Sequence, residues 1–264
     1  MPASLDQIVA ATRRKVSETL RSADLRELER QAEQHVPRGF RLALEKQNRT
    51  GPALIAELKK ASPSRGLIRA DFDPASLAAE LEAAGAAALS VLTDAEFFQG
   101  SLRNLQLASS ATKLPCLRKD FIVDEFQLLE ARANHADAIL LIVAALSPAE
   151  LETLAKKAKG YSLDVLCEVH DEKELERALG VGFDLIGVNS RDLRTFTVDL
   201  QSAFRLAGMM PKNVLSIAES GIQSGKDIAR LRAAGYQAFL IGESLMKAPS
   251  PGNALRTLIA QAES

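Results

Sequence analysis

Eight short apolar runs recur along the chain at nearly regular spacing from residue 54 onward, and this repeat constrains the fold more than any other feature. Their first residues lie 22 to 32 positions apart, which leaves room for one strand, one helix and two short loops in each repeat. The runs are Leu54–Leu58, Ala86–Leu92, Pro115–Lys119, Ala138–Val143, Leu163–Val169, Leu185–Val188, Val214–Ala218 and Ala238–Gly242.

Helical patterns fill the intervals between these runs. Residues Pro74–Ala84 place apolar side chains at helical spacing, and Ser147–Lys159 opens with an N-cap serine, a proline and a capping-box glutamate. Strict alternation of helices with nearly continuous apolar strands indicates a parallel sheet covered by helices. Eight units over about 210 residues predict an α/β fold, the (β/α)8 TIM barrel. The alternative, an open doubly wound sheet, usually has fewer strands and a glycine-rich loop after the first.

Residues 1–50 do not follow this repeat. Apolar residues at helical spacing predict one amphipathic helix from Leu5 to Leu20 and a second from Leu25 to Ala32. The segment is short and polar for an independent domain. We therefore predict two parts: an N-terminal helical extension, 1–50, packed on a catalytic barrel domain, 51–264.

Composition and charge exclude several classes of protein. The net charge of −1 gives no general affinity for nucleic acid. The longest apolar run, Ala138 to Leu146, has nine residues, whereas a membrane-spanning helix needs about 20. Cys116 and Cys167 both lie in apolar runs, which favours a reducing compartment. We predict a cytoplasmic protein, monomeric or weakly homo-oligomeric, without nucleic-acid or membrane partners.

Motifs of several other enzyme classes fail on spacing. The glycine-rich segment 180–187 precedes a strand instead of following one, and no G-x-S-x-G nucleophile motif occurs. His35, His135 and His170 have no metal-ligand spacing. We expect each histidine to be solvent-exposed or to cap a helix, and we predict no metal site.

Charged residues stand at the ends of four predicted strands, where barrel active sites collect. Two lysines and three glutamates converge there: Glu57 and Lys59, Lys119, Glu168, and Glu219. Burying such charges costs several kcal/mol unless they are paired or used. One explanation is a paired ionic network that closes the barrel top. We favour a functional site, because an apolar plug would close the barrel at lower cost.

Glycines follow the last two predicted strands, as Ser220-Gly221 and as Gly242-Glu243. In this fold, the loops at these positions commonly bind phosphate through backbone N–H groups. Ordinary turn glycines are the alternative. Together with the charges, the pattern predicts an enzyme that acts on a phosphorylated small molecule through proton transfers by lysine and glutamate.

Six segments in register give a more specific indication: LIAELKKASPS (54–64), LRKDFIVD (117–124), CEVHDEKEL (167–175), GVNSRDLRTF (187–196), AESGI (218–222) and LIGESLM (240–246). Together they resemble the indole-3-glycerol-phosphate synthase family of tryptophan biosynthesis. The resemblance implies a barrel with a helical N-terminal extension and no cofactor. It also implies the reaction: cyclisation of 1-(o-carboxyphenylamino)-1-deoxyribulose 5-phosphate, with loss of CO₂ and water, to indole-3-glycerol phosphate.

The resemblance also implies a role for each matching residue. Lys119 would be the general acid that protonates the substrate carbonyl, and Glu168 a base or an orienting carboxylate. Lys59, beside Glu57, would bind the anthranilate carboxylate or act as acid in the dehydration. The other expected catalytic residues are Glu57, Glu219 and Asn189. The expected substrate-binding residues are Arg191, Ser220, Phe98, Phe121, Leu140 and Leu193, and the expected phosphate-binding residues are Ser62, Gly221, Gly242 and Glu243.

Two details of this assignment stay open. The carboxylate of Glu243 would repel a phosphate, so only its backbone N–H could contribute to binding. The four apolar residues are as well explained by core packing as by contact with the aromatic ring. Two other functions also stay open: an isomerase of aminoaldose phosphates, and a phosphosugar-binding barrel without catalytic activity.

Overall fold

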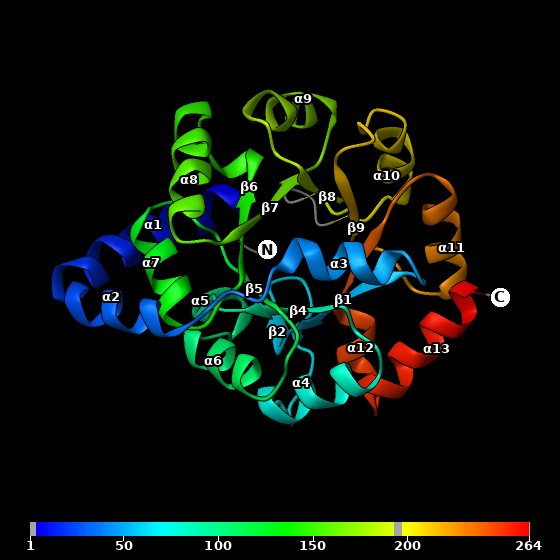
Figure 1. Ribbon diagram of the computed structural model, residues 1–264, viewed down its shortest axis with the longest axis horizontal. Coiled ribbons are helices and arrows are strands. Elements are labelled where there is room, and N and C mark those ends of the chain that lie inside the picture. The colour runs from blue at the N-terminus through cyan, green and yellow to red at the C-terminus, as the bar shows by residue number, and fades with distance from the viewer. Residues whose placement is uncertain (1–3, 193–196, 264) are drawn as a thin grey trace.

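Eight parallel strands close into a barrel in the computed structural model, which describes residues 4–192 and 197–263 (Figure 1). Around the barrel the order is β1-β10-β9-β8-β7-β6-β5-β4. The strands are β1 (Ala53–Leu58), β4 (Ala88–Leu92), β5 (Cys116–Lys119), β6 (Ala138–Ile142), β7 (Asp164–Val169), β8 (Leu185–Asn189), β9 (Leu215–Glu219) and β10 (Ala238–Ile241). Each predicted apolar run overlaps one of these strands, so the TIM-barrel prediction is confirmed.

Helices surround the barrel and connect its strands (Figure 1). The outer helices are α4 (Pro74–Ala83), α6 (Leu102–Ser110), α7 (Phe126–Ala133), α8 (Pro148–Gly160), α9 (Glu172–Val181), α10 (Leu200–Ala207), α11 (Gly225–Ala233) and α13 (Pro251–Glu263). Shorter elements lie in the loops: β2 (Ala61–Ser62), β3 (Gly66–Leu67), α5 (Ala95–Phe98), η1 (Val143–Ala145) and α12 (Glu243–Lys247). Within the described ranges, no helix has both the length and the apolar composition that crossing a membrane requires.

The two faces of each strand pack into two different apolar layers. In β1, Leu54, Ala56 and Leu58 belong to the layer between the strands and the outer helices. Ile55 belongs to the layer inside the barrel. Because side chains alternate along a strand, Glu57 must also point inward. Burial of both faces explains the continuous apolar runs, and the alternation directs a charged residue at the strand end into the barrel.

Three helices precede the barrel: α1 (Leu5–Ser22), α2 (Leu25–Gln34) and α3 (Phe40–Asn48). Helix α2 packs along α7, and the fully buried side chains of Phe40 and Leu44 bring α3 into the inner apolar layer. The sequence predicted the first two helices and missed α3. The extension thus packs on the barrel. The domain boundary after residue 50, the cytoplasmic location and the oligomeric state stay predictions.

A buried carboxylate attaches this extension to the barrel. Asp137 directly precedes β6, and its side chain accepts hydrogen bonds from Nε of Arg38 at 3.0 Å and from the backbone N–H of Cys116 at 2.6 Å. Nε2 of His35 lies 3.1 Å from the same carboxylate. Burial favours the neutral acid, but His35 and Arg38 hold the pKa of Asp137 below its ordinary value. Asp137 is therefore an ionised carboxylate that joins parts of the chain about 100 residues apart.

Replacing this carboxylate should destabilise the fold strongly. In Asp137→Asn, the partly buried guanidinium of Arg38 loses its fully buried counter-ion, and we expect the free energy of unfolding to fall by about 3–5 kcal/mol. Urea unfolding followed by circular dichroism measures this change. Arg13→Ala is the control, because it removes an exposed ion pair with Glu150 and should cost at most about 1 kcal/mol. Equal, small effects of both substitutions would contradict the prediction.

Candidate active site

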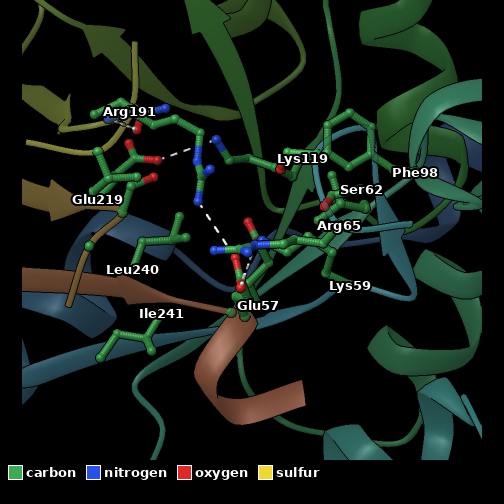
Figure 2. Close-up of a pocket in the computed structure, with 18 of the residues that line it drawn as sticks. Glu57, Lys59, Ser62, Arg65, Phe98, Lys119, Arg191, Glu219, Leu240 and Ile241 are labelled. Carbon is green, nitrogen blue, oxygen red and sulfur yellow. Dashed lines mark hydrogen bonds and ion pairs between the residues drawn. The ribbon is translucent and has the colours of Figure 1, made fainter. Parts of the chain in front are cut away.

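A cavity of about 520 Å³ opens at the carboxyl ends of the barrel strands, a size typical of sites for small molecules. All predicted site residues line it except Leu193, which lies outside the described residues. Those lining it are Glu57, Lys59, Ser62, Phe98, Lys119, Phe121, Leu140, Glu168, Asn189, Arg191, Glu219, Ser220, Gly221, Gly242 and Glu243. Figure 2 shows Glu57, Lys59, Lys119, Arg191 and Glu219 around a common space.

Lys119, the last residue of β5, lies between two carboxylates. Its Nζ is 2.8 Å from Oε2 of Glu168 and 3.2 Å from Oε2 of Glu219; Figure 2 shows the contact with Glu219. Burial opposes a charge on this amine, but the carboxylates of Glu168, Glu219 and Glu57 outweigh it and raise the pKa of Lys119. The side chain is therefore an ammonium group, and it can donate a proton to a bound molecule.

The two carboxylates beside Lys119 differ in their affinity for protons. Burial favours the neutral form of Glu168, but Lys119 and His170 hold its pKa well below the ordinary range. Burial raises the pKa of Glu219 to about 7, and the nearby charge of Glu168 adds to this effect although Lys119 opposes it. Among the described residues, Oε1 of Glu219 has no hydrogen-bond partner. Two neighbouring carboxyl groups with separated pKa values are suited to different roles in acid–base chemistry.

Two glycines make room for carboxylates in the crowded barrel. A Cβ at Gly187 of β8 would collide with Oε1 of Glu219, and a Cβ at Gly242 would collide with Oε1 of Glu57. Neither glycine has a positive φ, so the need is for space and not for an unusual backbone conformation. Each of these glycines lets a neighbouring carboxylate lie close against the backbone.

A second lysine–glutamate pair lies at the end of β1. Nζ of Lys59 is 2.6 Å from Oε1 of Glu57, and the pair lines the lower part of the cavity in Figure 2. The period of two along the strand predicted that both side chains share a face, and the structure confirms that they meet. The cavity thus holds two separate lysine–carboxylate groups, one on β1 and one on β5.

Cations gather at the cavity edge formed by the loops after β9 and β10. Glu243 begins α12, and its carboxylate is 2.6 Å from Nζ of Lys247, 3.1 Å from Nε of Arg65 and 3.6 Å from Nη2 of Arg191. The sequence patterns did not indicate Arg65 or Lys247. The i, i+4 spacing of Glu243 and Lys247 could have revealed the second. The repulsion expected from Glu243 is offset by three cations, so the edge can attract an anion.

The backbone beside these cations is shaped for close approach. Ser220 and Gly221 follow β9 with φ angles of +64° and +79°, in a region that side chains disfavour. A Cβ at Gly221 would lie 2.7 Å from a methyl carbon of Val198. Such a strained turn at a cavity mouth is typical of a functional loop. It presents backbone to the same space that the cations face.

Aromatic side chains form the opposite, apolar wall of the cavity. The rings of Phe98 and Phe121 have centroids 6.2 Å apart, and Leu140 lies in the inner apolar layer with Phe121. Phe98, Phe121 and Lys119 line the same cavity. An aromatic ligand could therefore pack here within reach of the ammonium group.

The histidines agree with the expectation only in part. His35 is the C-cap residue of α2, as a capping role would have it, and it also contacts Asp137. The prediction is wrong for His170, whose half-buried ring lies between the carboxylates of Glu168 and Glu174. Among residues 4–192 and 197–263, no cluster of three or more His, Cys, Asp or Glu side chains is arranged to hold a metal ion.

Comparisons with known proteins agree with this architecture. Two solved structures share the fold at a TM-score of 0.60: a thiamine phosphate pyrophosphorylase from Pyrococcus furiosus and KGPDC from Streptococcus mutans. They are 16% and 14% identical, and the matches cover 83% and 81% of this chain and 98% of each of those chains. Identities this low inform only on fold.

Sequence relatives are much more similar. Indole-3-glycerol phosphate synthase of Koribacter versatilis is 59% identical over 259 residues, which cover 98% of this chain and 100% of the relative. The protein of that name from Acinetobacter baumannii is 48% identical, over 97% of this chain and 96% of its own length. A family model described as "Indole-3-glycerol phosphate synthase" matches residues 5–258. The chain therefore belongs to the indole-3-glycerol phosphate synthase family.

Proposed function

We propose that this chain cyclises 1-(o-carboxyphenylamino)-1-deoxyribulose 5-phosphate to indole-3-glycerol phosphate, with release of CO₂ and water. Membership of the family makes the chain a decarboxylating lyase of tryptophan biosynthesis. The observation that carries the detailed proposal is the arrangement within one cavity. A lysine held by two carboxylates stands between an aromatic wall and a cationic edge.

Charge complementarity supports the proposed orientation of the substrate. The phosphate would occupy the edge formed by Ser220, Gly221 and Gly242, with Ser62 near it. Binding of the phosphate would let Arg65 and Lys247 exchange the Glu243 carboxylate for the phosphate oxygens. The anthranilate carboxylate would pair with Lys59 and Arg191, and the aromatic ring would pack on the wall that contains Phe98, Phe121 and Leu140. These placements put the sugar carbonyl near Lys119.

Proton transfers then follow from the charges of the site. The ammonium of Lys119 would donate its proton to the carbonyl oxygen while the ring carbon that bears the carboxylate attacks the carbonyl carbon. Loss of CO₂ would restore the aromatic ring. Departure of the protonated hydroxyl as water, with transfer of a proton from the neighbouring carbon beside the nitrogen to a carboxylate of the site, would complete the indole. Glu168 is ionised, as a base or an orienting carboxylate must be. Glu219, with a pKa of about 7, is suited to exchanging protons near neutral pH.

The direct test is to mix the purified chain with 1-(o-carboxyphenylamino)-1-deoxyribulose 5-phosphate and to follow indole fluorescence. The chain contains no tryptophan, so its own emission is weak at these wavelengths. We expect fluorescence to rise without added metal or nucleotide. Binding of the compound without any rise would overturn the proposal and favour a phosphosugar-binding protein. An aminoaldose phosphate converted in its place would favour the isomerase.

Removing the ammonium group of the site should abolish most of the activity. We expect Lys119→Ala to fold but to lose about 10²-fold or more in kcat, the usual contribution of a general acid. Lys157→Ala is the matched control, because this lysine lies on the outer helix α8 and pairs with Glu125 at the surface. Steady-state kinetics measure kcat for both variants, and circular dichroism checks that each variant folds. A folded Lys119→Ala variant with wild-type turnover would exclude the role.

We expect ionisation of Glu219 to lower the stability of the folded state, although this carboxyl group serves the reaction. Its folded-state pKa of about 7 lies above the ordinary 4.5, so the folded state binds a proton that the unfolded state releases between these values. The stability of the folded state therefore falls as the pH rises from about 4.5 to 7. Glu219→Gln cannot ionise, and we expect it to be more stable than wild type at pH 8 by about 1–3 kcal/mol, but nearly inactive.

Thermal unfolding of both proteins at pH 5 and pH 8 measures this effect. The gain in stability should shrink at pH 5, where the carboxyl of Glu219 is protonated in the folded wild type. A variant that is less stable than wild type at pH 8 would show that the ionised carboxylate stabilises the fold. Glu172→Gln, a change of the same kind on the exposed part of α9, should show no such pH dependence.

A further inference from the structure

The ring of His170 links the centre of the active site to an outer helix. His170 follows β7 directly, two residues after Glu168. Its Nε2 lies 3.4 Å from Oε1 of Glu168, and its Nδ1 lies 3.0 Å from Oε2 of Glu174 on α9. The backbone N–H of His170 also donates to Oε2 of Glu174, at 2.8 Å. One carboxylate of α9 thus fixes both the ring and the backbone of this residue.

Helix α9 is itself held in register at this end. Asp171 is its N-cap and accepts a hydrogen bond from the backbone N–H of Glu174 at 2.9 Å. Glu174 lies in the first turn, where a carboxylate is favoured by the helix dipole. The position of Glu174 is therefore determined by the helix start, and a carboxylate is presented to His170 in a defined place.

The imidazole carries a positive charge in this environment. Burial opposes protonation of the ring, but the carboxylates of Glu168, 3.4 Å from Nε2, and of Glu174, hydrogen-bonded to Nδ1, outweigh it and raise the pKa of His170 to about 10. The neighbouring strand β8 and the 3₁₀ helix η1 contain no titratable side chains. Lys119 of β5 contacts the other oxygen of Glu168, and Glu219 of β9 contacts Lys119. Within this group of described residues, two cations alternate with three carboxyl groups.

This arrangement matters when Lys119 gives up its proton. Glu168 is 1% exposed, and a buried carboxylate that loses its only cation tends to take up a proton. If Lys119 were the sole partner, Glu168 would become protonated as Lys119 became neutral. The ring of His170 stays charged at the other oxygen of Glu168 throughout this step. Glu168 can then remain ionised and in place to bind the returning proton on Lys119.

We propose that His170 is a positioning residue of the reaction: its imidazolium, held by Glu174, keeps Glu168 ionised and directed at Lys119 while Lys119 is neutral. This inference rests on the proposed function, because it takes Lys119 as the proton donor. His170 is not one of the described residues that line the cavity. It therefore acts through Glu168 and not by contact with the substrate.

The first measurement requires no substitution and no turnover. The chain has three histidines, so ¹⁵N labelling of histidine gives a simple NMR titration, and His170→Gln identifies the signal that belongs to His170. We expect the ring of His170 to stay protonated from pH 6 to pH 9. A ring that titrates near the ordinary value of 6.5 would overturn the proposal, whatever the activity of the chain.

The second measurement is the pH profile of kcat with 1-(o-carboxyphenylamino)-1-deoxyribulose 5-phosphate. We expect His170→Gln to lower kcat by about 10- to 100-fold, with KM changed less than about threefold. In Glu174→Gln the pKa of His170 should fall toward the ordinary range. Activity should then decline as the pH rises through a new ionisation between about pH 7 and 9. The double variant His170→Gln/Glu174→Gln should lack this ionisation, because it has no imidazole at position 170.

The outcomes separate the two proposals. Glu172→Gln is the matched control on α9, since its carboxylate pairs with Arg205 at the surface, and its profile should be that of the wild type. Wild-type kcat in a folded His170→Gln variant would overturn the role of His170 alone. An unchanged profile in Glu174→Gln would do the same. An inactive wild type would instead overturn the proposed function, and with it the reaction that His170 would serve.

Discussion

The ammonium of Lys119 lies between Glu168 and Glu219 at the buried end of β5, and removing such charges from water is costly unless each is neutralised. Much of the surrounding structure compensates for the free energy of removing these charges from water. The strands bring the three groups together from β5, β7 and β9, and Gly187 leaves space for the carboxylate of Glu219. The apolar layers on both faces of the sheet fix the strands rigidly enough to hold this geometry. Stability and site are therefore built from the same strands, with the charges confined to one end.

The carboxyl groups at the two ends of the barrel have different environments. At the carboxyl ends, the pKa values of Glu168 and Glu219 are pushed apart, and one of them lies near neutral pH. At the amino ends, Asp137 has enough donors to remain ionised, and it joins the N-terminal extension to the barrel. Saturating a carboxylate with donors makes a fixed attachment point. One oxygen of Glu219 has no hydrogen-bond partner among the described residues, which keeps it available for chemistry.

The sequence predicted most of the barrel because each strand buries both faces and so leaves a continuous apolar run. The site was largely predictable as well, since charges at the ends of such runs have few explanations. The misses have physical causes. Helix α3 buries only Phe40 and Leu44 while Leu42 is 64% exposed, and its N-cap residue, Gly39, provides no side-chain cap, so its sequence pattern is weak. The bond from Arg38 to Asp137 joins distant residues, which no local pattern reveals. The role of His170 was not predicted, because its partners lie in two different elements, Glu168 in β7 and Glu174 in α9. A pattern within one element does not reveal such a contact.

Closure of the barrel depends on β10, the last of its eight strands in the sequence. β10 pairs with β9 and with β1, and Gly242, which follows it, lies against Glu57 of that first strand. Without β10, the sheet of the other seven strands would have two open edges, at β1 and β9, and the polar groups of the site would be exposed to water. Lysine and glutamate in water keep their ordinary proton affinities and are poor catalysts. The shifted proton affinities of the site therefore require the pairing of β10 with both β1 and β9.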